Sequence, residues 1–295
     1  MAQTNPSGPS FTVIPGNESI LDSLSLQSAT GLFADAITAG DKAESLHKPG
    51  LEPWRQRWRL TTPSGQILYL KKFTNPPTSS RKAFQHLTPK VRSLAGLEAF
   101  WMTRLHEKGI PTIKPVAWAE EMDSSGTRER QSAILMHAVP GQSLESWCLE
   151  PAVTLTINRS KVMKGVAELA ARLHSAGLFH RDLYLSHIFY EQAATPKDDR
   201  PQDTSNLHLI DLTRIVEDRS DALRRRVKDL AALNHSTPFD LVSNTQRVRW
   251  LKQYLHTPKL TAQQRRLLYR IVGKTAAMKR HDRRRSQRRS RNADA

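Results

Sequence analysis

The sequence predicts an α+β fold of two lobes, in which an antiparallel sheet with one helix is followed by a helical lobe. In RWRLTTPSGQILYLKKF, apolar and polar residues alternate on both sides of the turn at residues 63–65, which is typical of a β-hairpin. Two further strand-like stretches lie around residues 113–120 and 132–138. After the Pro-Gly pair at residues 140–141 the spacing becomes mainly helical, which predicts a boundary between lobes near that pair.

This pattern divides the chain into four parts. Residues 1–44, rich in Ser, Pro, Gly and Asn, are expected to form a flexible leader with one weak amphipathic piece. Residues 45–138 form the predicted sheet lobe, and residues 139–278 form the helical lobe. Residues 279–295 lack large apolar side chains and predict a disordered basic tail.

The sheet lobe is expected to contain one helix, from about Thr88 to Lys108, ended by Gly109 and Pro111. Glu98 lies on the apolar face of this helix, where a carboxylate needs a cation or a donor because unpaired burial costs several kcal/mol. A position at the edge of the face, in reach of water, stays open as the alternative. The apolar face consists of Val91, Leu94, Leu97, Trp101 and Leu105.

The clearest helix precedes the stretch HRDLYLSHIF. In SKVMKGVAELAARLHSAGLFHRD, Ser160 is a plausible N-cap, and Gly177 lies where a left-handed residue ends a helix. The helix therefore delivers residues 180–182 into a loop. A short apolar strand in NLHLIDLTRI then ends at Asp211.

The formal charge of +17 predicts a polyanionic partner, such as nucleic acid, an anionic membrane surface or a phosphate-bearing substrate. Nucleic acid is disfavoured because no aromatic residues are interleaved with the basic residues of the tail to stack on bases. A tail that only solubilises the protein remains an alternative.

Cysteine content and hydropathy indicate a cytoplasmic protein. The single cysteine, Cys148, excludes an internal disulfide and a cysteine-based zinc cluster, which favours a reducing compartment. The N-terminus shows no signal peptide pattern, and no stretch approaches the roughly 18 apolar residues of a spanning helix. We expect a soluble or peripheral protein, with the inner face of the cytoplasmic membrane as its place if it is peripheral.

Four charged residues stand out in chain order: Lys71 on a strand, Glu98 in a helix, Asp182 in a loop and Asp211 at a strand end. Phosphoryl transfer from a nucleotide needs a lysine for the phosphates, a glutamate that holds it, a carboxylate near the acceptor hydroxyl and a carboxylate for Mg²⁺. The order matches a protein-kinase-like fold and predicts a phosphotransferase.

Longer stretches carry a closer resemblance. The run LHSAGLFHRDLYLSHIFY, followed by LHLIDLTRI and RRRVKDLAAL, resembles the lipopolysaccharide kinase family, the Kdo kinase and heptose kinase group of the protein-kinase-like superfamily. The resemblance covers roughly residues 45–280. It is most specific in HRDLYLSHIF and KDLAAL.

The resemblance implies a role for each residue of the set. Asp182 becomes the base for the acceptor hydroxyl, Asp211 the main ligand of Mg²⁺ or Mn²⁺, and Lys71, paired with Glu98, the lysine that binds the phosphates of ATP. Lys72 is the rival of Lys71. Neighbouring strand residues face opposite ways, and we favour Lys71, which shares a face with Tyr69.

Three departures from the general kinase pattern are visible. His187 stands five residues after Asp182, where an Asn usually binds a second metal; we expect it to contact cofactor and metal, with a core His bonded to the loop backbone as the alternative. Asp211 is followed by Leu-Thr rather than Phe-Gly. No GxGxxG occurs, so arginines of residues 55–59 are candidates to help hold the phosphates.

Asp229 resembles the residue that supports the catalytic loop from a buried helix, unless it is a carboxylate at a helix N-terminus.

The leading functional hypothesis is an ATP-dependent kinase that phosphorylates a sugar hydroxyl of a lipopolysaccharide-core glycolipid. Only about 18 residues separate Asp211 from Asp229, which is short for an activation loop with a peptide-docking platform. The arginines at 224–226 and the tail would bind lipid or core phosphates at the membrane. Two alternatives stay open: a kinase-like enzyme acting on protein or another small molecule, and a catalytically silent basic binding module.

Overall fold

The computed structural model describes residues 8–35, 37, 43–46, 52–87, 90–150, 159–191, 206–218 and 220–293. The chain divides into two compact units. The sheet unit contains residues 1–139 with 211–213, and the helical unit contains residues 140–210 with 214–295. The division falls between Val139 and Pro140, next to the Pro-Gly pair that predicts a boundary.

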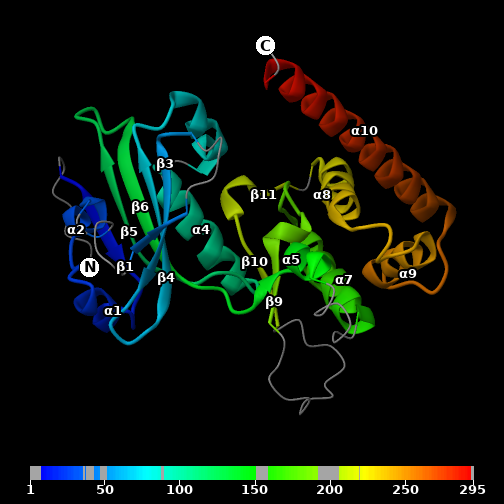
Figure 1. The fold of residues 1–295 in the computed structure, drawn as a ribbon, viewed down its shortest axis with the longest axis horizontal. Coiled ribbons are helices and arrows are strands. Elements are labelled where there is room, and N and C mark those ends of the chain that lie inside the picture. The colour runs from blue at the N-terminus through cyan, green and yellow to red at the C-terminus, as the bar shows by residue number, and fades with distance from the viewer. Residues whose placement is uncertain are drawn as a thin grey trace. The chain divides into compact units, whose positions relative to one another are not determined.

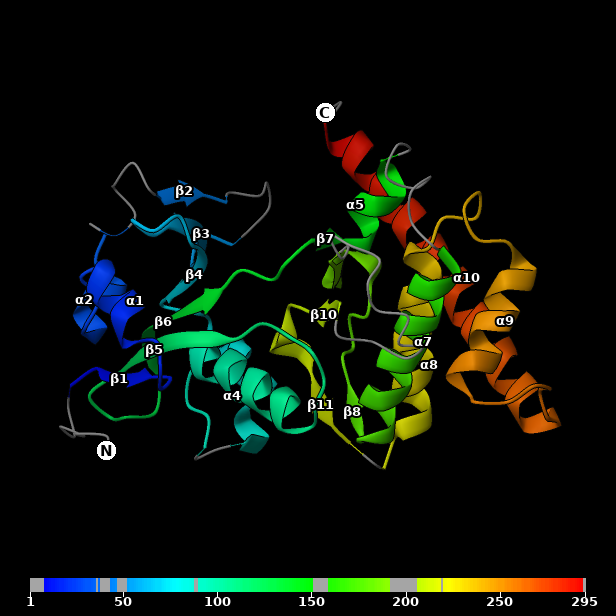
Figure 2. The ribbon, with the colours of Figure 1, turned by 90° about the horizontal axis from the view of Figure 1, so that it is seen from below.

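One antiparallel sheet forms the centre of the sheet unit (Figure 1), with the strand order β1-β5-β6-β4-β3-β2 (Figure 2). The predicted hairpin is β3–β4, and Gly65 at φ 83° lets its turn close, with its N–H donating to the Thr62 carbonyl at 2.9 Å. The strands are β1 (Ser10–Val13), β2 (Ala43–Ser45), β3 (Arg55–Thr61), β4 (Ile67–Thr74), β5 (Pro115–Met122) and β6 (Glu129–His137).

Helix α4 (Leu94–Glu107) is the helix that the apolar spacing predicts, and it packs on β4, β5 and β6 (Figure 2). It begins after the expected start, because Ser93 caps it by accepting from the Gly96 N–H at 2.9 Å. Residues 88 and 89 lie outside the described part of the chain. Two 3₁₀ segments, Thr78–Ala83 and Gln85–Leu87, precede it.

The opposite face of the sheet is covered by α1 (Glu18–Ser23) and α2 (Ala29–Phe33). This differs from the expectation of a flexible leader over residues 1–44. The described part of the leader supplies β1 to the sheet and packs Leu21 and Leu32 against Leu68 and Leu70. The reason is that both faces of this sheet are apolar, and an apolar face must be buried against another element.

The helical unit is built around α7, α8, α9 and α10. Helix α7 packs against α9, and α10 packs against α8. Gly177, at φ 76°, adopts the left-handed conformation predicted after α7. The helices are α5 (Leu144–Leu149), α7 (Arg159–Ser175), α8 (Ala222–Ser236), α9 (Asn244–Tyr254) and α10 (Ala262–Ala293). Short strands complete the unit: β7 (Gln142–Ser143), β8 (Leu178–Phe179), β9 (Ile188–Tyr190), β10 (Leu207–Leu209) and β11 (Val216–Glu217).

Helix α10 occupies the region where the sequence predicts a disordered tail from residue 279 onward. It continues to Ala293. The physical reason is that Leu267, Ile271 and Thr275 are buried and fix the first turns, so that each further residue only has to extend an existing helix. Arginine extends helices readily, and no Gly or Pro follows Gly273. In the described part of the chain, no helix combines the length and the apolar character that crossing a bilayer requires.

Candidate active site

Lys71 and Glu98 form a buried ion pair in the sheet unit. Lys71 Nζ donates to Glu98 Oε2 at 2.6 Å, and the side chains are 13% and 0% exposed. Lys72 points to the other face of β4, where its Nζ donates to the carbonyls of Phe33 and Ala34 at 3.1 and 2.8 Å. The predicted pairing of Lys71 with Glu98 is therefore present, and the exposed position considered for Glu98 is wrong.

The N-terminus of α4, the helix that carries Glu98, is tied to β6. The Leu94 N–H donates to Glu129 Oε2 at 3.0 Å, and the Ala95 N–H donates to Ser132 Oγ at 3.2 Å. Ser132 Oγ in turn donates to Glu129 Oε1 at 2.6 Å. These bonds satisfy N–H groups that have no partner inside the helix, and they fix α4 on the sheet.

Burial raises the pKa of Glu129 to about 7, despite the hydrogen bonds from Ser132 and Leu94 that favour its ionised form. The charge of Glu120, which Arg92 engages at 2.7 Å, acts in the same direction as burial. The sequence gives no signal for this role, because Glu129 is one acidic residue in the charged turn MDSSGTRER.

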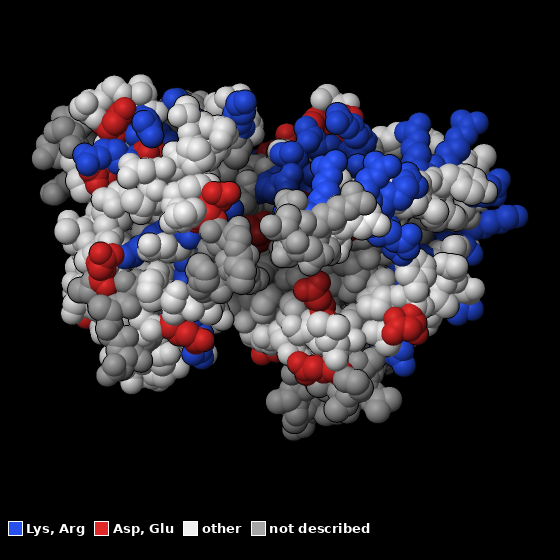
Figure 3. Space-filling view, turned by 45° about the horizontal axis from the view of Figure 1, so that its top comes forward, with Lys and Arg blue, Asp and Glu red and all other residues white. Residues whose placement is uncertain are grey.

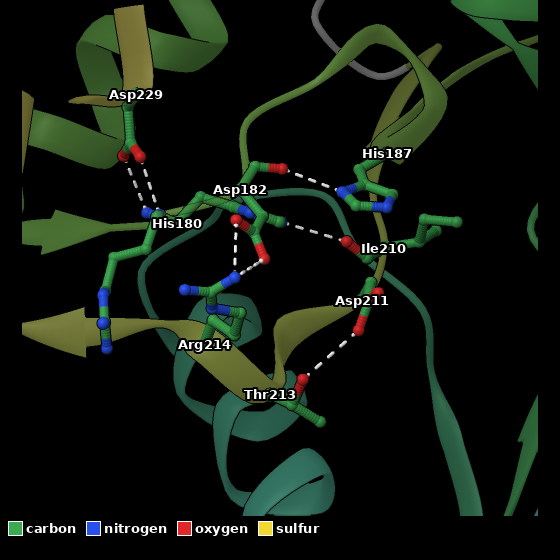
Figure 4. A network of polar contacts seen from close by, with 9 residues as sticks. His180, Asp182, His187, Ile210, Asp211, Thr213, Arg214 and Asp229 are labelled. Carbon is green, nitrogen blue, oxygen red and sulfur yellow. Dashed lines mark hydrogen bonds and ion pairs between the residues drawn. The ribbon is translucent and has the colours of Figure 1, made fainter. Parts of the chain in front are cut away.

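Asp229 of α8 anchors the loop HRDLYLSHIF, which lies in the same helical unit (Figure 4). Its carboxylate is fully buried and accepts from the backbone N–H groups of His180 at 2.8 Å and Arg181 at 2.6 Å. His180 Nε2 donates to the Ile210 carbonyl at 3.0 Å. Asp229 is the eighth residue of α8, so the alternative of a carboxylate at a helix N-terminus is wrong.

A buried His–Tyr pair supports Asp229 from behind. His174 Nε2 lies 3.2 Å from Asp229 Oδ2, and His174 Nδ1 lies 2.8 Å from the Tyr254 hydroxyl. Burial raises the pKa of Tyr254, which keeps the hydroxyl protonated. The sequence does not single out either residue, since neither His174 nor Tyr254 disturbs the helical spacing of apolar residues around it.

Asp182 projects from the loop toward Arg214. Arg214 Nη1 donates to both carboxylate oxygens of Asp182, at 3.0 and 2.8 Å (Figure 4). The side chains of Arg214 and Asp182 are 51% and 20% exposed. Sequence reasoning missed Arg214, although the stretch DLTR places it three residues after Asp211.

His187 bonds to the backbone of the same loop. Its Nδ1 lies 2.8 Å from the carbonyl oxygen of Asp182, which can only accept, so Nδ1 carries the proton. In the neutral form of the ring, the lone pair then lies on Nε2. The structure thus contains the loop contact considered as the alternative for His187, and a contact with cofactor or metal stays a prediction.

Asp211 is held in an uncommon conformation. Its φ is 59°, and Thr213 Oγ1 donates to its Oδ1 at 3.3 Å. Arg181 also has a positive φ, of 67°. Such backbone conformations in residues other than Gly are costly, and they concentrate at functional sites. Leu212, next to Asp211, is fully buried, so the apolar position after the carboxylate is kept.

The chain matches the profile of the lipopolysaccharide kinase (Kdo/WaaP) family over residues 58–266. This range includes the loop supported by Asp229, the Lys71–Glu98 pair and Asp211. The chain belongs to this family. The family that the sequence resembles is thereby confirmed.

Relatives and a solved structure agree with this membership. The lipopolysaccharide core heptose(I) kinase WaaP of Pseudomonas aeruginosa is 29% identical over 180 residues, which are 58% of this chain and 63% of that protein. The WaaP of Escherichia coli K12 is 28% identical over 203 residues, 66% of this chain and 72% of that protein.

A solved structure, WaaP in complex with acyl carrier protein, aligns with a TM-score of 0.59 and 22% identity, over 93% of this chain and 98% of that one. This similarity confirms the predicted fold class. The match to the Pseudomonas relative spans less than two thirds of that protein's length.

Proposed function

We propose that this chain is an ATP-dependent kinase that phosphorylates a sugar hydroxyl of a lipopolysaccharide-core glycolipid. The observation that carries the proposal is the loop of Asp182, bonded by Asp229 at 2.8 and 2.6 Å, in a member of the lipopolysaccharide kinase family. Two relatives are heptose(I) kinases of the lipopolysaccharide core. A heptose hydroxyl of the inner core is therefore the first acceptor to test.

Lys71 is the proposed ligand of the ATP phosphates, and Glu98 holds its ammonium group in place. Asp211 supplies a hard carboxylate oxygen, the donor that Mg²⁺ or Mn²⁺ prefers beside phosphate oxygens, so the residue fits a metal. His187 would be a second and weaker ligand through Nε2. When bound, the metal neutralises charge on the phosphates.

Asp182 acts on the acceptor in this proposal. It accepts the proton of the sugar hydroxyl while the hydroxyl oxygen forms a bond to the γ-phosphorus and the bond from that phosphorus to ADP breaks. Asp229, through the backbone of His180 and Arg181, fixes where the carboxylate of Asp182 lies. Positioning of this kind supplies much of the rate in phosphoryl transfer.

A basic face of the helical unit supports a location at the inner surface of the cytoplasmic membrane. Figure 3 shows Lys and Arg side chains gathered over one face of this unit. Arg224 of α8 is 86% exposed, and residues 280–288 of α10 are exposed throughout. Each basic residue near an anionic surface contributes about 1 kcal/mol to binding. Arg225 is partly neutralised by Asp218 at 2.9 Å, and Arg226 is half-buried with its Nε buried, so neither adds as much exposed charge as Arg224.

Phosphate transfer from labelled ATP tests the proposal. The purified protein would be incubated with Mg²⁺ or Mn²⁺ and, in parallel, with heptose-containing core glycolipid and a generic protein acceptor. We expect labelled glycolipid with the wild type and none with Asp182→Asn. Labelled protein alone would overturn the choice of acceptor, and the absence of any transfer by a folded protein that ATP does not stabilise would overturn the activity.

A further inference from the structure

Arg214 uses only one of its three guanidinium nitrogens to bind Asp182. Only Nη1 engages the carboxylate, at 3.0 and 2.8 Å. Within the described residues, Nε and Nη2 of Arg214 make no hydrogen bond. These two nitrogens form a planar fork that matches two oxygens of a phosphate group.

The surroundings of Arg214 contain more positive than negative charge. Burial lowers the pKa of Lys228 and of Arg181, and in both cases the charge of Arg214 acts in the same direction. The carboxylates that face this group are Asp182 and Asp229, and Asp229 is already occupied by backbone N–H groups. Arg225 also acts on Arg181, and Asp218 engages it at 2.9 Å. Four cations thus share three carboxylates, and the excess of positive charge favours binding of an anion.

The ion pair with Asp182 does not by itself explain Arg214. Its side chain is 51% exposed, and exposed ion pairs contribute about 0–1 kcal/mol to stability. A guanidinium group fixed next to the candidate base Asp182 is better suited to binding a negatively charged ligand beside that base than to stabilising the fold. A buried nitrogen, Arg181 Nε, has no hydrogen-bond partner in the described part of the chain and lies in the same charged group.

We infer that Arg214 is a catalytic residue of the transfer proposed above, in which its Nε and Nη2 bind oxygens of the γ-phosphoryl group as it passes to the acceptor. The inference rests on the proposed function. Asp182 takes the proton of the hydroxyl, the new O–P bond forms, the bond to ADP breaks, and Arg214 stabilises the charge on the transferring oxygens. The contact through Nη1 orients the guanidinium group for this task.

Variants of Arg214 test the inference against a matched control. Arg214→Gln removes the charge and the fork, Arg214→Lys keeps the charge alone, and Arg128→Gln removes an arginine from an exposed turn. For Arg214→Gln we expect a loss of about 10²–10³-fold in kcat, the loss typical for removing one stabilising donor. The rise in melting temperature with ATP and Mg²⁺ should match the wild type, and Arg214→Lys should recover part of the rate.

Chemical rescue separates direct action from a structural role. Added guanidinium ion at non-denaturing concentration should restore part of the activity of Arg214→Ala. Because arginine stays charged between about pH 6 and 9, the loss of rate in Arg214→Gln should stay constant over that range. If the wild type transfers no phosphate, the proposed function fails. If the wild type is active while Arg214→Gln matches Arg128→Gln, or if the deficit disappears at high pH, the inference about Arg214 is overturned and the function stands.

Discussion

At the scale of single residues, adjacent lysines on β4 have opposite tasks. The alternation of a strand sends Lys71 to Glu98 and Lys72 to the end of α2. This much follows from the sequence, because Lys71 shares a face with Tyr69. The carbonyl partners of Lys72 do not follow from it, since they depend on α2, which the sequence does not place.

Replacement of these lysines by methionine should separate the two tasks. Lys71→Met leaves Glu98 buried without its cation, which should lower the free energy of unfolding by about 3–5 kcal/mol and abolish stabilisation by ATP. Lys72→Met leaves two carbonyls without a donor, which should lower it by about 1–3 kcal/mol while ATP still raises the melting temperature. Thermal melts with and without ATP and Mg²⁺ measure both effects. An equal ATP response in the two variants would contradict the assignment.

Asp229 should be the most sensitive buried position of the helical unit. In Asp229→Ala the N–H groups of His180 and Arg181 lose their acceptor, and each unsatisfied donor costs about 1–3 kcal/mol. Urea unfolding should show this loss. Tyr254→Phe, which removes one hydroxyl behind His174, should reduce stability by only about 1 kcal/mol. A neutral effect of Asp229→Ala would refute its supporting role.

At the scale of elements, α4 is the helix on which the site of the sheet unit depends. Its apolar face and Glu98 could be predicted from spacing alone. Its anchor could not, because Glu129 and Ser132 lie on a strand about 35 residues further along the chain and show no periodic pattern. Contacts of this kind arise from the tertiary fold.

Titration of Glu129 predicts a pH dependence of stability. Its carboxyl ionises near pH 4.5 when unfolded but near pH 7 when folded, so folding becomes less favourable as the pH rises through this window. A rise of this size corresponds to about 3 kcal/mol. Melting curves of Glu129→Gln and the wild type should therefore diverge in favour of the variant between about pH 5 and 8. Parallel curves would show that Glu129 does not titrate there.

The two ends of the chain show where sequence patterns mislead. The short apolar segments that contain Leu21 and Leu32 give only a weak helical pattern by themselves. In the structure they belong to the same core as the buried leucines of β4. The end of α10 lacks apolar residues and reads as disordered, although its start is fixed by Ile271. In both cases the stabilising partner is distant in the sequence, so local composition underestimates order.

At the scale of the whole molecule, the net charge of +17 should govern binding to anionic surfaces. Residues 283–295 contain six arginines, and replacing them all by glutamine keeps the length of the chain. Binding to vesicles with anionic lipid should weaken by several kcal/mol, at about 1 kcal/mol for each arginine, and should weaken further with salt. Sedimentation with vesicles measures this, with neutral vesicles as the control. Unchanged binding would show that these arginines do not contact the membrane.

The position of the added phosphate on the product tests both the proposed activity and the role of Asp182. The wild type, Asp182→Asn and the exposed control Asp240→Asn would each react with ATP, Mg²⁺ and heptose-containing core glycolipid, and mass spectrometry would locate the added phosphate. We expect one phosphate on a core sugar with the wild type and the control, and none with Asp182→Asn. Equal product from Asp182→Asn would contradict the role of Asp182, and the absence of product with every protein would contradict the proposed activity.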